Sequence, residues 1–234
     1  MSGAVTFDLG QTLVDLDHDL LARRVAERGA RLDPRVAERE TPDAWTAYNA
    51  AKRSGREGRE AWLHFMVTLL SHSGLPDTPS RELAAWLWTE QPKHNLWRKP
   101  VPGMLELVDA VEQAGVPVGV VSNSEGRILE LFDELGWADR FRCVADSGRL
   151  GFEKPDARIF EWACERLGVA PSALVHVGDS WEADVRGALG VGARVVWFPA
   201  DPSRELPPRV APCTTPEEVR GALVRFGVPF DGRG

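Results

Sequence analysis

Three acidic side chains are the clearest candidates for chemistry, because two of them stand directly after short apolar runs. Asp8 follows the run Ala4–Phe7, and Asp179 follows Leu174–Gly178, with Asp184 five residues further on. Such runs are typical of buried parallel strands, and open α/β sheets bind ligands at the carboxyl ends of their strands. Carboxylates at that edge can act as nucleophiles or bind a hard cation. Taken alone, Asp8 is better explained as a residue that caps the strand end or begins a turn, and Asp179 is explained as a helix N-cap.

A hydroxyl, an amide and an amine accompany the acids. Ser122 and Asn123 end another apolar run, and Lys154 stands just before Pro155. A proline at this place is typical of the first turn of a helix, which we expect over 156–167. Taken alone, these side chains could be a capped strand end and a solvated lysine. Their order along the chain together with the acids favours one shared site.

Four segments resemble the motifs of the haloacid dehalogenase-like (HAD) hydrolases, and they occur in the same order. They are 8–12 (DLGQT), 118–123 (VGVVSN), 151–156 (GFEKPD) and 174–184 (LVHVGDSWEAD). The resemblance implies a hydrolase that removes phosphate from a small phosphorylated metabolite. The reaction would pass through an aspartyl-phosphate intermediate and depend on Mg²⁺.

The resemblance also gives each side chain a role. Asp8 would attack phosphorus, and Lys154 would balance the charge of the nucleophile and the phosphate. Ser122, Asn123 and Lys154 would hold the phosphoryl oxygens. The implied magnesium ligands are Asp8, the backbone carbonyl of Gly10, Asp179 and Asp184. A cation is needed because a phosphate ester brings negative charge to a site that already holds three carboxylates.

Gly10 departs from the family pattern, in which phosphatases carry a second Asp two residues after the nucleophile. That Asp serves as general acid and base, a contribution of about 10² to 10⁴ in rate. The amide of Gln11 does not titrate and is no substitute. Three interpretations remain: a substrate whose leaving group departs without a proton, an acid supplied by another residue, or a fold kept for binding alone. The candidate acids are His18, His64 and His94.

Two other HAD reactions are alternatives. Phosphonate-cleaving members also carry a small residue at the position of Gly10 and form a Schiff base with a lysine of the inserted domain, for which Lys52 is the candidate. Dehalogenases attack carbon without a metal and tend to carry a bulky aromatic residue where Gly10 stands. The retained pair Asp179 and Asp184 argues against that reaction.

The surrounding pattern predicts the elements that position these side chains. We expect an α/β fold with a Rossmann-like parallel sheet, helices on both faces, and an inserted α-helical cap. The core would comprise 1–15 and 99–234, and the cap 16–98, where helical spacing prevails and no strand is expected. Further strands are expected at 142–145 and 193–197. The tail is proline-rich over 199–216, and a short helix is expected after it at 217–226.

Composition limits the classes of binding partner and the cellular location that we expect. The chain has 234 residues and a formal net charge of −7, which argues against a nucleic-acid partner. Three scattered cysteines lack metal-ligand spacing and suggest reduced thiols. No segment resembles a signal peptide or membrane span, so we expect a soluble cytoplasmic protein, a monomer or homodimer. Five tryptophans and a group of arginines fall in the expected cap, where core packing and a solvated face explain them best.

Overall fold

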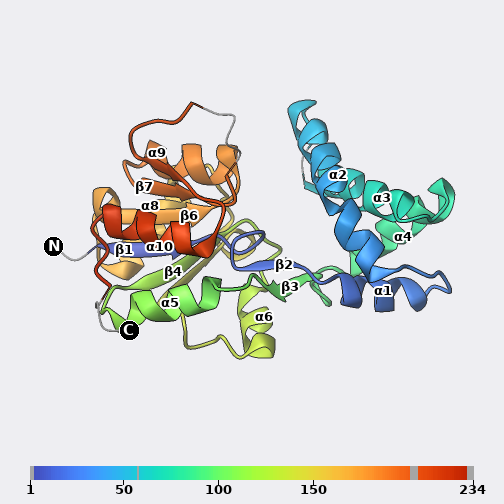
Figure 1. Cartoon of the computed structure of the whole chain (residues 1–234), viewed down its shortest axis with the longest axis horizontal. Coiled ribbons are helices and arrows are strands. Elements are labelled where there is room, and N and C mark those ends of the chain that lie inside the picture. The colour runs from blue at the N-terminus through green and yellow to red at the C-terminus, as the bar shows by residue number, and fades with distance from the viewer. Residues whose placement is uncertain (1–2, 57, 201–204, 231–234) are drawn as a thin grey trace. The chain divides into compact units, whose positions relative to one another are not determined.

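The computed structural model describes residues 3–56, 58–200 and 205–230, which form two compact units (Figure 1). One unit combines Met1–Asp15 with Arg98–Gly234, and the other is Leu16–Trp97. The chain therefore leaves the first unit after its first strand and returns to it about eighty residues later. The candidate acids, Ser122, Asn123 and Lys154 all belong to the first unit.

A six-stranded sheet forms the centre of the first unit. Its strand order is β5-β4-β1-β6-β7-β8, and every neighbouring pair is parallel. The strands are β1 (Ala4–Phe7), β4 (Val118–Ser122), β5 (Cys143–Asp146), β6 (Leu174–Gly178), β7 (Arg194–Trp197) and β8 (Val210–Pro212). Because β1 pairs with both β4 and β6, the first, second and fourth motif segments end side by side at one edge of the sheet.

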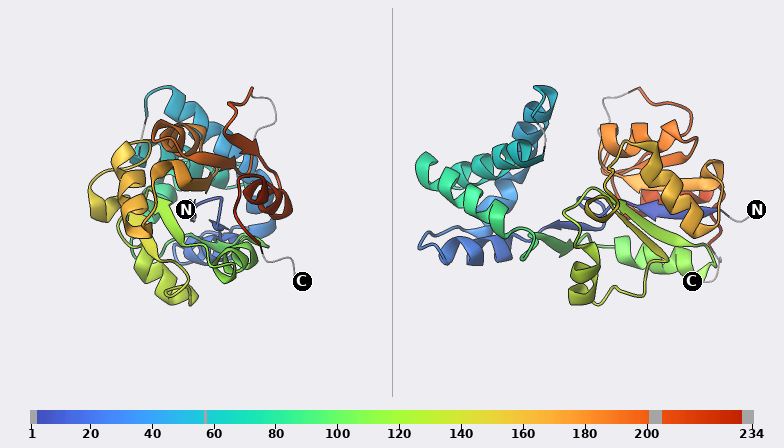
Figure 2. Two further views of the ribbon diagram at one scale, coloured as in Figure 1. Left: turned by 90° about the vertical axis from the view of Figure 1, so that its left-hand side faces the viewer. Right: turned by 180° about the vertical axis from the view of Figure 1, so that it is seen from behind.

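Helices cover this sheet in two layers (Figure 1, Figure 2). In one layer α8 (Ala157–Leu167) packs on α9 (Gly187–Gly190) and against β4 and β5. In the other layer α5 (Met104–Gln113) packs on α10 (Pro216–Arg225) and against β4. The remaining helical segments are α6 (Ile128–Leu135), α7 (Ser147–Leu150), η1 (Pro171–Ala173) and η2 (Trp181–Arg186). The expected α/β class, a parallel sheet flanked by helices, is confirmed.

The strands form where the sequence has short, continuously apolar runs. All four residues of β1 and all five of β4 and β6 are buried, as expected for a sheet covered on both faces. Helix α8 begins after Asp156, whose side chain accepts from the backbone N–H of Arg158, and ends at Leu167, before the cap residue Gly168 with a φ of 71°. Both ends therefore carry the capping residues that a free helix terminus requires.

The second unit is helical. It contains α1 (His18–Ala26), α2 (Pro34–Arg53), α3 (Gly58–His72) and α4 (Asp77–Glu90). Apolar side chains from the four helices pack in one core, in which the rings of Trp45, Phe65 and Trp97 contact one another. Trp62 joins this group through Trp97. Trp62 and Phe65 are buried in this core, and Trp45 and Trp97 are partly buried and pack against it.

Three expectations about the elements are wrong in detail. A two-stranded sheet of β2 (Val14–Leu16) and β3 (Trp97–Pro100) reaches into the range 16–98, where no strand was expected. Strand β8 lies inside the stretch interpreted as a proline-rich tail. Pro155 precedes the cap residue of α8 instead of lying in its first turn. The short strands β2, β3 and β8 depend on pairing with distant segments, which a local pattern does not report.

Helices long and apolar enough to span a bilayer are not found among the residues that the structure describes.

Candidate active site

The candidate site lies at the carboxyl ends of three adjacent strands. Asp8 follows β1, Ser122 is the last residue of β4, and Asp179 follows β6. The backbone N–H of Asp8 donates to the carbonyl of Val177 at 2.8 Å, which continues the β1–β6 ladder past the end of β1. Parallel pairing therefore brings these polar residues to one edge, where α/β sheets bind ligands.

Lys154 joins two of the acids. Its Nζ donates to Oδ1 of Asp8 at 2.7 Å and to Oδ1 of Asp184 at 2.6 Å. All three side chains are largely removed from solvent, with 2% of the lysine side chain and none of that of Asp184 exposed. Segments more than one hundred residues apart thus meet in one ion-paired group.

Burial and charge act in opposite directions on these groups. Burial alone would lower the pKa of Lys154, but Asp184 and Asp8 hold it above its ordinary value. Burial would raise the pKa of Asp184, yet Lys154 and His176 hold it well below the ordinary value. At neutral pH the amine is therefore charged and the Asp184 carboxyl is ionised, since each stabilises the charge of the other.

Asp179 completes a cluster of three carboxylates. One oxygen from each of Asp8, Asp179 and Asp184 lies within 4.8 Å of the others. Burial, followed by the charges of Asp184 and Asp8, raises the pKa of Asp179 well above its ordinary value. A carboxyl in this position is stabilised by a cation or by a proton. The oxygen donors and their spacing fit a hard divalent ion such as Mg²⁺.

A tight loop carries the nucleophile candidate out of β1. The N–H groups of Leu13 and Val14 both donate to the carbonyl of Leu9, and that of Gln11 donates to the carbonyl of Val14. Gln11 has a φ of 57°, in the left-handed region that favours glycine. Its side-chain Nε2 donates to Oδ2 of Asp179 at 2.8 Å. The loop thus contacts the fourth motif segment as well as forming the first.

A buried histidine, His176, lies within hydrogen-bond distance of Asp184. Oδ1 of Asp184 lies 2.9 Å from Nε2 of His176, and Nδ1 of that ring lies 2.9 Å from Oγ1 of Thr6. Thr6 and His176 are register partners on β1 and β6, so both side chains point to the same face of the sheet. Oδ2 of Asp184 accepts from the backbone N–H of Ser180 at 2.9 Å. Both carboxylate oxygens of Asp184 are therefore fixed in direction.

Asn123 binds the backbone of Lys154 with both ends of its amide. Its Nδ2 donates to the Lys154 carbonyl at 3.0 Å, and its Oδ1 accepts from the Lys154 N–H at 2.8 Å. This pair of bonds connects the loop after β4 to the loop before α8. In this arrangement the Asn123 side chain fixes the position of Lys154.

Other candidates for chemistry lie in the helical unit. His18 is buried, and its Nε2 lies 2.8 Å from Oγ1 of Thr41. His64 and His94 are exposed. Lys52 is exposed near the end of α2, with Nζ 5.9 Å from the ring centre of Tyr48. Their proposed roles as proton donors or as a Schiff-base lysine stay predictions.

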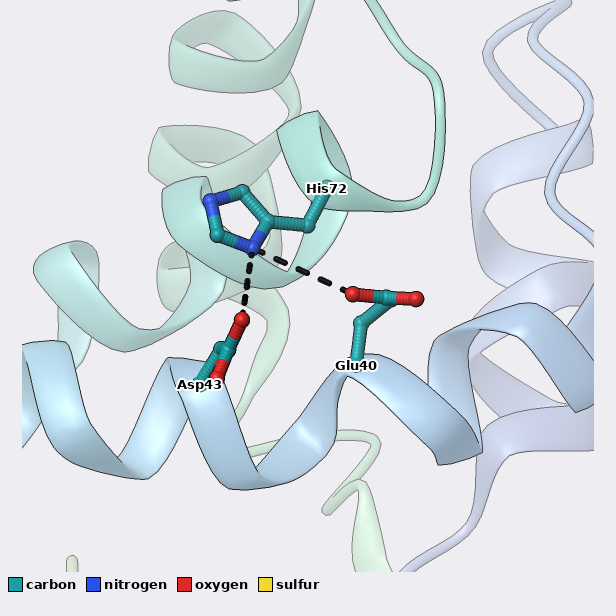
Figure 3. Close-up of side chains that lie close together, drawn as sticks. All are labelled: Glu40, Asp43 and His72. Atoms are coloured by element: carbon teal, nitrogen blue, oxygen red, sulfur yellow. Dashed lines mark ion pairs between the residues drawn. The ribbon is translucent and has the colours of Figure 1, made fainter.

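A second group of possible metal ligands joins α2 to α3 (Figure 3). Nδ1 of His72 lies 3.3 Å from Oδ2 of Asp43 and 4.0 Å from Oε2 of Glu40. The Asp43 and His72 side chains are 65% and 46% exposed. Solvated groups with such spacing are explained by an ordinary surface ion pair between two helices.

Sequence reasoning missed the residues that support the acids, namely Thr6, His176 and Gln11. A polar side chain inside an apolar strand is the signal that could have found the first two. Buried polar groups need partners, and Thr6 and His176 stand two residues before Asp8 and Gly178. The contact of Gln11 with Asp179 depends on the tertiary fold and leaves no local signal.

Comparison with known proteins identifies the family. Residues 3–192 match the model of the haloacid dehalogenase-like hydrolases. The chain belongs to this family and is a hydrolase of the HAD type.

Similar proteins include phosphatases. An N-acetylmuramic acid 6-phosphate phosphatase of Pseudomonas aeruginosa is 30% identical over 192 residues, 82% of this chain and 79% of that protein. A ribulose-1,5-bisphosphate 5-phosphatase of Halopiger xanaduensis is 30% identical over 214 residues, 88% of this chain and 87% of that protein. The HAD-hydrolase YfnB of Bacillus subtilis, solved bound to magnesium, matches with a TM-score of 0.70 at 18% identity, covering 95% and 98% of the two chains. This last likeness supports the fold.

Proposed function

We propose that the chain is a Mg²⁺-dependent phosphatase that acts on a small phosphorylated metabolite through an aspartyl-phosphate on Asp8. One observation carries the proposal: Lys154 contacts Asp8 and Asp184 together, and a carboxylate oxygen of Asp179 lies within 4.8 Å of an oxygen of each of these acids. Two relatives that are 30% identical over most of the chain are named as phosphatases.

The charges of the site support a divalent cation. Three carboxylates stand against one ammonium group, so a doubly positive ion would balance the cluster. Asp8, Asp179, Asp184 and the backbone carbonyl of Gly10 would hold it. When bound, the ion supplies Lewis-acid stabilisation of the phosphoryl oxygens. The raised pKa of Asp179 is in keeping with a group that needs such a partner.

Asp8 performs the first step of the proposed reaction. A carboxylate oxygen of Asp8 attacks phosphorus, a new phosphorus–oxygen bond forms, and the ester bond breaks. The electron pair of that bond leaves with the oxygen of the alcohol. Lys154 and Ser122 stabilise the charge on the phosphoryl oxygens, while Asn123 fixes the backbone of Lys154. We propose this positioning role for Asn123 in place of direct contact with the phosphoryl group.

Water completes the reaction. Its oxygen attacks phosphorus, the bond to Asp8 breaks, and the carboxylate is restored while phosphate leaves. Gly10 has no side chain that could protonate the departing alcohol oxygen in the first step or accept a proton from this water in the second. We therefore propose that the best substrates are anomeric, acyl or aryl phosphates, whose leaving groups depart without much protonation.

We propose that the helical unit acts as the cap that selects the leaving group. Its aromatic residues Trp45, Trp62, Phe65 and Trp97 pack in or against its core, so we propose that other side chains of the unit select the substrate. Arg53, Arg56 and Arg59 are exposed, and a second anionic group on the substrate is a partner that exposed arginines can bind.

A phosphate-release screen tests the proposal. The purified chain is assayed against a panel of phosphorylated metabolites, once with Mg²⁺ and once with excess chelator. Release that requires Mg²⁺ is expected for at least one anomeric, acyl or aryl phosphate. Full release in excess chelator would contradict the metal site, and absence of release over the panel would favour the binding-protein alternative.

Treatment with borohydride distinguishes phosphonate cleavage through Lys52 from the proposed phosphatase reaction. Borohydride traps a Schiff base between a lysine and a carbonyl substrate as a stable adduct. No adduct is expected with wild-type protein, and Lys52→Ala should leave phosphate release unchanged. An adduct lost in Lys52→Ala would favour the phosphonate-cleaving reaction.

A further inference from the structure

Gln11 adopts a backbone conformation that its residue type disfavours. Among residues 3–56, 58–200 and 205–230, it is the non-glycine residue with a positive φ, at 57°. A β-carbon in this region meets the following carbonyl, a cost that glycine avoids. The loop imposes the conformation, because the Gln11 N–H donates to the carbonyl of Val14 at 2.8 Å. Strained residues that persist in a site point to a role for their side chains.

The Gln11 side chain contacts Asp179, the carboxylate of the cluster to which Lys154 does not donate. Nε2 of Gln11 donates to Oδ2 of Asp179 at 2.8 Å. Asp179 faces the like charges of Asp8 and Asp184, and the two bonds of Lys154 go to those other acids. The amide thus supplies a donor to a carboxylate that repulsion would turn away from the cluster.

The backbone of Asp179 is held separately. The indole Nε1 of Trp197 donates to the Asp179 carbonyl at 2.7 Å, and Trp197 in turn packs its ring on that of Trp181. With its main chain fixed in this way, the carboxylate of Asp179 retains rotation about its side-chain bonds. The bond from Gln11 restricts that rotation.

We propose that Gln11 is a positioning residue that holds Asp179 in the orientation needed to bind the divalent cation. The amide engages Oδ2 and leaves the other carboxylate oxygen for the ion. This role rests on the proposed metal site and extends it to a residue outside the acidic ligands. It also gives a reason for glutamine at a position where glycine suits the backbone better.

Two variants separate the side chain from the backbone. Gln11→Gly removes the amide and relieves the strain, whereas Gln11→Leu removes the amide and keeps a β-carbon at the same φ. Gln113→Leu is the matched control, because Gln113 is an exposed glutamine at the end of α5. Binding of Mg²⁺ to the metal-free full chain is measured by calorimetry, and the melting temperature shows that each variant is folded.

Gln11→Gly and Gln11→Leu should each weaken Mg²⁺ binding by about 10- to 100-fold, the usual effect of removing a partner of a metal ligand. Gln113→Leu should bind as the wild type does. Since glycine suits the left-handed region, Gln11→Gly should melt at a higher temperature than Gln11→Leu. Gln11→Gly would then bind Mg²⁺ as weakly as Gln11→Leu although it is the more stable of the two, so lost stability would not explain the weak binding.

Other outcomes overturn the inference. If either variant binds Mg²⁺ as tightly as the wild type or more tightly, the amide does not hold Asp179 for the ion. If only Gln11→Gly is weak, the change in the backbone is responsible, because Gln11→Leu keeps the β-carbon at the same φ. If only Gln11→Leu is weak, the leucine side chain itself disturbs the site. A wild-type chain that binds no Mg²⁺ would overturn the metal site itself, and the role of Gln11 with it. If the wild type releases phosphate only with Mg²⁺, and both Gln11 variants bind Mg²⁺ as it does, the role of Gln11 alone is overturned.

Discussion

A β-carbon on Gly178 would lie 2.7 Å from the β-carbon of Asp184 and 2.8 Å from its Oδ2. The carboxylate of Asp184 therefore fills the space that a side chain at the end of β6 would occupy. Side chains alternate along a strand, so the vacant position of Gly178 lies on the face of His176. The glycine allows Asp184 to contact His176 and Lys154 together.

Gly178→Ala should displace Asp184 and break both contacts. Overpacking of a buried site costs about 1 to 3 kcal/mol of unfolding free energy, and we expect Mg²⁺ affinity and phosphate release to fall as well. Gly190→Ala is the control, since no atom of the residues that the structure describes lies within 4 Å of a β-carbon there. Urea unfolding and calorimetry check both variants. Unchanged Mg²⁺ affinity in Gly178→Ala would show that the site tolerates displacement of Asp184.

Asp179→Asn should stabilise the metal-free protein at neutral pH. The pKa of Asp179 is raised, chiefly by burial and then by Asp184 and Asp8, so the ionised carboxylate costs folding free energy above the folded-state pKa. An amide removes that cost. The gain should shrink as the pH falls through the folded-state pKa and vanish below about pH 4, where the carboxyl is protonated in both states.

Saturating Mg²⁺ should reverse the order of stability, because the ion binds the folded wild type and not the variant. Melting curves with and without Mg²⁺, at several pH values, make the measurement. Asp139→Asn, at an exposed position, gives the same change in net charge away from the cluster. A metal-free Asp179→Asn that melts below the wild type at neutral pH would contradict the charge argument.

Gly10→Asp should increase turnover of alkyl phosphates, whose alkoxide leaving groups most need a proton. The ceiling is about 10² to 10⁴, and a smaller gain is expected because the surrounding packing was not shaped for the side chain. Aryl and anomeric phosphates should gain less at the first step. The positive φ of the loop belongs to Gln11 and not to Gly10, so the added β-carbon avoids the left-handed region.

Turnover of alkyl and aryl substrates by Gly10→Asp is compared with wild type, with melting temperature measured alongside. A folded variant that binds Mg²⁺ yet gains nothing on any alkyl phosphate would count against the missing-acid explanation. An acid from the helical unit would then be the better hypothesis.

The sheet could be predicted from the sequence because its strands are continuous apolar runs. Strand β1 has the predicted bounds, and β4, β6 and β7 agree to within a residue. The short strands β2, β3 and β8 could not be predicted in this way. They contain three or four residues and include prolines and charged residues, so their pairing is decided by distant segments.

The site could be predicted only as far as motif order extends. Lys154 contacts both Asp8 and Asp184, and Asp179 joins the two acids in one carboxylate cluster. The use of both ends of the Asn123 amide and the contact of Gln11 with Asp179 depend on which loops meet in three dimensions. Motif matching gives residue types at positions, whereas hydrogen-bond partners follow from the fold.

Chemical capture of the phosphoryl group on Asp8 tests the central claim most directly. An aryl phosphate releases its phenolate without a proton donor, while attack by water lacks a base at Gly10. The second step should therefore be slow, and the aspartyl-phosphate should accumulate. Acid quench during turnover with p-nitrophenyl phosphate and Mg²⁺, followed by peptide mass analysis, should find a phosphoryl group on the peptide containing Asp8. Asp8→Asn should show neither the group nor phosphate release. Continued turnover by Asp8→Asn, or an unmodified Asp8 peptide during full turnover, would contradict the account.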